Sequence, residues 1–72
     1  MGVTDTILED WLRRKDADGI AWFTGEDLRR LGIPDPLMTV MQDVQHMLRL
    51  RRSDKVVETA GNTGGFSVRE TE

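Results

Sequence analysis

The sequence predicts an α+β domain, in which a three-helix bundle with a helix-turn-helix is followed by a C-terminal two-stranded β-hairpin. Three features support this prediction. Residues 3–15 and 36–52 repeat apolar side chains at helical spacing. A Gly-Ile-Pro corner at residues 32–34 separates a short helix from the longer one that follows it. After residue 54, apolar and polar residues alternate on both sides of a glycine-rich loop, which is typical of a hairpin.

The composition indicates one small domain over residues 1–72, with an ordered core over about residues 4–70. A chain of this size buries only about 60% of its unfolded surface, so its stability depends on a single core. Cysteine is absent, which excludes disulfides and thiolate metal sites. No apolar run approaches the roughly 20 residues that span a bilayer, and the first ten residues lack the pattern of a secretory signal. We therefore expect a cytoplasmic protein with no membrane partner.

The formal net charge is −3, which opposes indiscriminate binding to nucleic acid or to anionic membranes. The charge is unevenly distributed, because one short stretch, residues 49–55, is basic. It carries Arg49, Arg51, Arg52 and Lys55 against Asp54 alone. Such a cluster is either a phosphate contact or a solvated helix end, and the sequence leaves both interpretations open.

The first helix is expected over residues 3–15. Its apolar side chains recur at the spacing of one helical face: Ile7, Leu8, Trp11 and Leu12. Either Thr4 caps its amino end, or Thr6 does so in a capping box with Glu9. The loop after it contains Asp-Ala-Asp-Gly, a fragment of the calcium-binding EF-hand loop. The alignment fails because Arg14 and Gly25 would stand at the first ligand and bidentate positions.

The apolar stretch at residues 20–23 is interpreted as a short strand or an extended approach to the second helix. Large aromatic side chains dominate small cores, so Trp11, Trp22 and Phe23 are expected to form the aromatic core.

The second helix is expected over residues 26–31. Thr24 and Asp27 have the spacing of a capping box at its start. Gly32 is suited to the left-handed conformation that ends a helix, and Ile33 can contact Leu28 there in a Schellman motif. These signals predict a helix that ends in a sharp turn.

The third helix is expected from residue 36 to 51 or 52, with Asp35 as its cap and Pro36 at its first position. One broad face is apolar and contains Leu37, Val40, Met41, Val44, Met47 and Leu48. The opposite face is polar and contains Thr39, Gln42, His46 and Arg49, with Asp43 and Met38 at its margins. Leu50 lies off the apolar face, so a later segment is expected to cover it.

The hairpin strands are expected at residues 55–60 and 66–70. The loop between them is Gly61-Asn62-Thr63-Gly64-Gly65, whose residues tolerate positive φ.

The order of these elements resembles the winged helix-turn-helix superfamily over about residues 4–70. The resemblance rests on that order, on the segment TGEDLRRLGI and on the hairpin KVVETAGNTGGFSVRE. Leu28, Leu31 and Ile33 match the core positions of the family's second helix and turn. A weaker resemblance is to the sterile-alpha-motif (SAM) domain, which the segment ADGIAWFTGEDLRRLGI resembles. Residues 11–19 are too few for the additional SAM helix, and SAM domains do not end in a hairpin.

The winged helix resemblance implies a small DNA-binding protein, either a transcriptional regulator or a DNA-processing accessory factor. The third helix would then enter the major groove and read bases with Thr39, Gln42, His46 and Arg49. Arg29 and Arg30 on the second helix would lie against the DNA backbone, and Arg52 would be a further basic contact. The remaining contacts, to phosphate or to the minor groove, would come from the hairpin, or wing: Asn62, Thr63 and Gly64 at its tip, with Lys55 and Arg69 on its strands.

An alternative function is a protein-interaction or dimerisation module on the same scaffold. The polar helix begins with Asp35 and carries Asp43, and acidic residues weaken contact with phosphates. The wing tip contains neither lysine nor arginine. The sequence does not indicate an enzyme. His46 is the single histidine, so a histidine-based metal site or a catalytic triad lacks its partner residues. We expect no catalytic residue, no metal and no cofactor.

Overall fold

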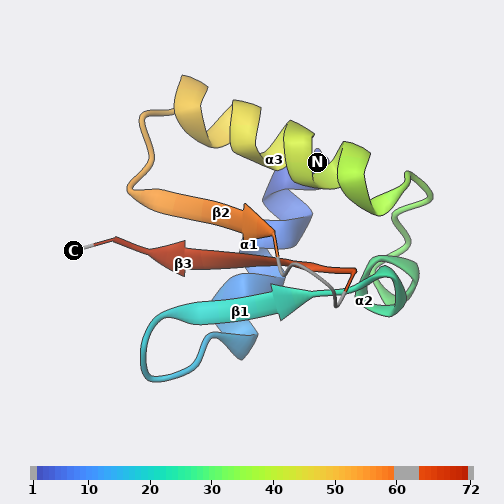
Figure 1. Ribbon diagram of the computed structural model, residues 1–72, viewed down its shortest axis with the longest axis horizontal. Coiled ribbons are helices and arrows are strands. Elements are labelled where there is room, and N and C mark those ends of the chain that lie inside the picture. The colour runs from blue at the N-terminus through green and yellow to red at the C-terminus, as the bar shows by residue number, and fades with distance from the viewer. Residues whose placement is uncertain (1, 60–63, 72) are drawn as a thin grey trace.

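The computed structural model describes residues 2–59 and 64–71. Its elements follow the expected order (Figure 1), and their bounds are α1 Val3–Arg14, β1 Ile20–Phe23, α2 Gly25–Arg30, α3 Leu37–Leu50, β2 Lys55–Thr59 and β3 Phe66–Glu70. The protein is thus a small α+β fold with three helices and a three-stranded antiparallel sheet over these residues.

The sheet has three strands in the order β1-β3-β2, so the prediction of a two-stranded hairpin is wrong in the strand count. β1 pairs antiparallel with β3, with Phe23 opposite Phe66 and Ala21 opposite Val68. The rings of Phe23 and Phe66 stack with centroids 5.4 Å apart. This partner lies more than 40 residues away in sequence, so a local pattern cannot show it. The arrangement is compatible with a winged helix and disagrees with the SAM alternative.

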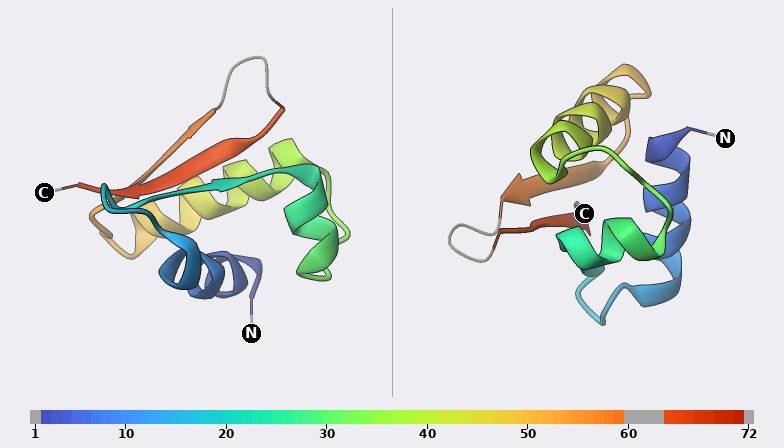
Figure 2. Two further views of the ribbon diagram at one scale, coloured as in Figure 1. Left: turned by 90° about the horizontal axis from the view of Figure 1, so that it is seen from below. Right: turned by 90° about the vertical axis from the view of Figure 1, so that its right-hand side faces the viewer.

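The three helices lie on one face of the sheet and leave the other face to solvent (Figure 2). Because side chains alternate along a strand, each strand contributes to both faces. The face toward the helices carries the fully buried Phe23, Phe66 and Val68. From α3, the buried side chains are Val40, Met41, Val44 and Leu48. The expected apolar face of α3 is therefore the face that packs on the core.

Two predicted helix caps are wrong. Gly2 is the N-cap of α1, so Thr4 and Thr6 both lie inside the helix. Thr4 faces the core, and the Thr6 hydroxyl donates back to the Gly2 carbonyl at 3.2 Å. At α3 the N-cap is Pro36, with no side-chain cap hydrogen bond, so Asp35 does not cap the helix.

The signals around α2 are confirmed. Thr24 and Asp27 form both hydrogen bonds of a capping box. Gly32 has a φ of 73°, and the Ile33 N–H donates to the Leu28 carbonyl at 2.9 Å, as in a Schellman motif. These contacts are all local in sequence, which is why a helix of only six residues could be predicted.

The carboxyl end of α3 repeats this motif without glycine. Arg52 has a φ of 53°, and the Ser53 N–H donates to the Leu48 carbonyl at 2.9 Å. The turn directs the chain from α3 straight into β2. A side chain in the left-handed region costs about 1 kcal/mol relative to glycine.

Three large apolar side chains are exposed against expectation. Leu12 and Leu50 are each 64% exposed, so Leu12 is not part of the core and no described segment covers Leu50. Trp22 is 52% exposed because it alternates with the inward-facing Ala21 and Phe23. Only Trp11 and Phe23 belong to the aromatic core as predicted.

Candidate nucleic-acid interface

The exposed face of α3 presents the predicted row of polar side chains. Thr39, Gln42, His46 and Arg49 are all exposed and follow one another along one side of the helix. Within the described part of the chain, none of these four side chains makes a hydrogen bond or ion pair. The row is therefore available to an external ligand.

One margin of this row is fixed to the sheet. The Gln45 side chain donates to the Val57 carbonyl on β2 at 3.1 Å. A groove of about 250 Å³ between α3 and β2 opens beside this bond, lined by Gln45, Leu48, Arg49, Ser53, Lys55, Val56 and Val57. Arg49 and Lys55 make this margin basic.

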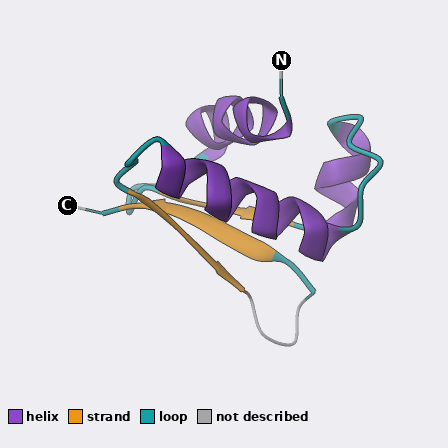
Figure 3. Ribbon diagram, turned by 90° about the horizontal axis from the view of Figure 1, so that it is seen from above, coloured by secondary structure: helices purple, strands orange, loops and turns teal. Residues whose placement is uncertain are grey.

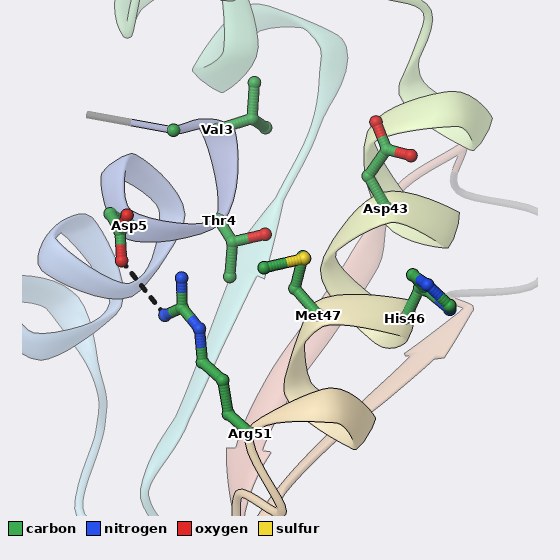
Figure 4. A pocket seen from close by; sticks show the side chains of 8 residues that line it. Val3, Thr4, Asp5, Asp43, His46, Met47 and Arg51 are labelled. Atoms are coloured by element: carbon green, nitrogen blue, oxygen red, sulfur yellow. Dashed lines mark hydrogen bonds and ion pairs between the residues drawn. The ribbon is translucent and has the colours of Figure 1, made fainter.

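The other margin borders a groove of about 330 Å³ between α3 and the amino end of α1 (Figure 4). It is lined by Gly2, Val3, Thr4, Asp5, Asp43, His46, Met47 and Arg51. Thr4 and Met47 point toward each other, whereas the His46 ring points away from α1. Arg51 donates to Asp5 at 3.0 Å, and this ion pair together with Asp43 gives the groove no excess positive charge. A phosphate has no evident partner there.

The first strand of the hairpin, β2, runs alongside α3 (Figures 1 and 3). β2 begins after the carboxyl end of α3 and runs back along the helix in the direction of its amino end. Gly64, on the return to β3, has a φ of 70°. The predicted contacts Asn62 and Thr63 lie outside the described residues.

Three of the predicted basic DNA contacts are engaged inside the protein. Arg30 pairs with Asp10 at 3.1 Å and Asp27 at 3.3 Å, and Arg69 pairs with Glu58 at 2.7 Å. The Lys55 ammonium lies 4.8 Å from the Trp11 ring centroid and 3.7 Å from Asp54. Because these three side chains already have partners within the protein, they are less available to bind a phosphate. By contrast, Arg29, Arg49 and Arg52 are exposed, and no ion pair involves them within residues 2–59 and 64–71.

Asp10 is the centre of a charge network that sequence reasoning did not find. It is 3% exposed and receives hydrogen bonds from Arg14 at 2.7 Å and from Arg30 at 3.1 Å. Burial raises the pKa of the Asp10 carboxyl, but the hydrogen bonds from Arg30 and Arg14 outweigh it, so the pKa is below its ordinary value. The only sequence signal was an acidic residue three positions after the buried Ile7, on the inward side of the helix.

Asp27 belongs to the same charge network through Arg30. Burial raises the pKa of this carboxyl, whereas hydrogen bonds from Thr24 and Arg30 lower it more, leaving a net decrease. Hydrogen bonds to Asp10 and Asp27 raise the pKa of Arg30. Arg30 thus joins α2 to α1, and its role is to fix the position of α2 and the turn that leads into α3.

Comparison with known proteins gives no assignment. No family model matches the chain, and no curated protein or solved structure matches it. No helix in the described ranges is long and apolar enough to cross a membrane. The same ranges contain no group of three or more side chains that could hold a metal ion.

Proposed function

We propose that this chain is a winged helix-turn-helix domain that binds duplex DNA, as a transcriptional regulator or a DNA-processing accessory factor in the cytoplasm. One observation carries the proposal: among the described residues the exposed row on α3 has no hydrogen-bond or ion-pair partner, and α3 is followed by a β-hairpin whose first strand runs back along the helix. An α-helix fits the major groove, and a flanking hairpin can then reach the backbone.

Each side chain of the row has a role that suits its chemistry. Gln42 can donate and accept at adenine, and Arg49 can donate twice to guanine or contact a phosphate. Thr39 and His46 are further base or backbone contacts. Arg29 and Arg52, which are exposed at the ends of α2 and α3, are the proposed backbone contacts. Arg30, Lys55 and Arg69 are left out of this set because they are engaged internally.

Because few basic side chains are available for phosphates, we expect the DNA affinity to depend only weakly on salt concentration. Each neutralised phosphate contributes about −0.9 to the slope of log K against log salt concentration. Contacts from Arg29, Arg49 and Arg52 then give a slope of about −3. A protein of net charge −3 would gain little non-specific affinity, so its binding would depend on the DNA sequence.

The test is a titration of the isotope-labelled protein with duplex DNA, selected from a random pool, at low and high salt. We expect shifts at Gln42, His46 and Arg49, and these should weaken as salt rises. Arg49→Ala should weaken binding about tenfold or more. Arg13→Ala is the matched control, because Arg13 is an exposed arginine of α1, distant from the row. Failure to select any duplex, or an equal effect of the two substitutions, would refute the proposal.

A further inference from the structure

The outer face of the sheet is a second surface without a partner in the fold. Strand register places its side chains in two rows across the three strands. One row is Ile20, Arg69 and Val56, and the other is Trp22, Ser67 and Glu58. No helix covers this face (Figure 2). Of these six residues, three are apolar (Ile20, Trp22 and Val56), Arg69 is the single cation, Glu58 is the single anion, and Ser67 is neutral and polar.

Trp22 is the most prominent residue of this face. It is 52% exposed, whereas its cross-strand neighbour Ser67 is only 5% exposed. Trp22 therefore presents about half of its surface to solvent. Tryptophan and arginine are the side chains that most often dominate binding energy in protein interfaces, and here Trp22 and Arg69 are neighbours.

Part of each sheet edge is already hydrogen-bonded within the fold, which favours approach of a partner to the face. On β1, the Ile20 N–H and C=O both bond to Asp16, and Arg14 donates to the Trp22 carbonyl at 3.0 Å. On β2, Gln45 donates to the Val57 carbonyl. Capped edges oppose the addition of a further strand.

We propose that two copies of this chain associate through the outer sheet face. The charges favour a second copy, because Arg69 and Glu58 make the face neutral on a protein of net charge −3. A neutral face is where two acidic molecules repel each other least. It is also self-complementary, because the same patch presents both the cation and the anion.

A two-fold axis perpendicular to the strands gives the best match of the two grids. Each strand then faces its own counterpart with the rows exchanged. Ile20 faces the Trp22 of the second copy, and Arg69 faces its Ser67. Each Arg69 also lies one strand spacing from the opposing Glu58, so it can bridge both carboxylates. No like charges face each other in this arrangement, whereas an axis parallel to the strands would oppose the two Arg69 side chains.

The available area makes this dimer a weak one. Stable complexes bury about 800 Å² on each partner, and the whole molecule exposes 4777 Å². Three strands of four or five residues span only about 17 Å by 10–15 Å. We therefore expect reversible association in the micromolar to millimolar range, independent of whether DNA is bound.

The first experiment uses the unmodified protein. Sedimentation equilibrium over concentrations up to about 1 mM should show a monomer–dimer equilibrium. Over the same range, acrylamide quenching of Trp22 should decrease, whereas Trp11, which is 3% exposed, should stay protected. A strict monomer, or association without protection of Trp22, would overturn the proposal.

Variants then identify the face. Trp22→Ser should raise the dimer dissociation constant at least about tenfold. Leu50→Ser, which alters an exposed apolar residue on α3, is the control and should leave it unchanged. Arg69→Glu alone should weaken the dimer, and the exchange E58R/R69E should restore it, because both the internal and the intermolecular pairs are then reversed. Circular dichroism confirms that each variant is folded. Dimerisation that survives both Trp22→Ser and Arg69→Glu would also overturn the proposal.

Discussion

Removing the charge of Asp10 should destabilise the fold more than any other single charge removal. Asp10→Asn keeps the size of the side chain but leaves Arg14 and Arg30 without their shared carboxylate. Deleting one partner of a fully buried pair costs about 3–5 kcal/mol. Here the carboxylate is 3% exposed, but the Arg14 and Arg30 side chains are 35% and 50% exposed and can be hydrated. We therefore expect a loss of about 2 kcal/mol.

For a domain of this length, a loss of about 2 kcal/mol lowers Tm by roughly 8–16 °C. Thermal and urea unfolding at pH 7, followed by circular dichroism, measures both quantities. Glu9→Gln is the matched control, because it removes an exposed charge from the adjacent position of α1 and should change stability by less than about 0.5 kcal/mol. A loss in Asp10→Asn as small as in the control would refute the role given to Asp10.

The same network predicts the dependence of stability on pH. The pKa of Asp10 is lower in the folded protein than its ordinary value of 3.8. The folded state therefore binds fewer protons, so the stabilisation is present above pH 3.8 and is lost as the pH falls through the lowered pKa. The stabilities of the unmodified protein and Asp10→Asn should converge in strong acid. A gap that is unchanged at low pH would show that the carboxylate charge is not its cause.

Three further substitutions test the fold. Arg52→Gly should raise stability by about 0.5–1 kcal/mol, because glycine adopts a φ of 53° without strain; a lower Tm would contradict this. Gly65→Ala should lower stability by about 1–3 kcal/mol in urea unfolding, since a Cβ there would lie 2.6 Å from the Phe23 carbonyl oxygen; an unchanged midpoint would show that the backbone yields easily. Phe66→Ala should cost about 3–5 kcal/mol by the same measurement, because Phe66 is fully buried and stacks on Phe23; a loss below 1 kcal/mol would contradict this role in the core.

The parts of the fold that could be predicted from sequence are those whose contacts are local. The capping box of Thr24 and the turn at Gly32 each involve residues within five positions of one another. The apolar face of α3 was also predictable, because a helix of 14 residues shows its period clearly. The pairing of β1 with β3 was not, since a strand of four residues carries almost no pattern of its own.

In the candidate site, too, local features could be predicted from the sequence and contacts between distant residues could not. The exposed positions Thr39, Gln42, His46 and Arg49 follow from helical geometry alone, so the sequence predicted where they lie. Whether a basic side chain is available to bind DNA depends on whether an acidic side chain elsewhere in the chain pairs with it. Arg30 meets Asp10 from 20 positions away, and Arg69 meets Glu58 across two strands. Residue type could not separate these arginines from Arg29 and Arg49.

The strand order has a consequence for how the protein is made. β3, which follows β1 and β2 along the chain, is the central strand, and among the described residues both of the other strands pair with it. Until β3 has left the ribosome, Ala21, Phe23 and Val57 have no sheet to pack in, and the helices have no surface to cover. An incomplete chain ending before residue 66 would therefore expose most of the future core. Such a fragment should behave as an unfolded chain and be a target for chaperones and proteases.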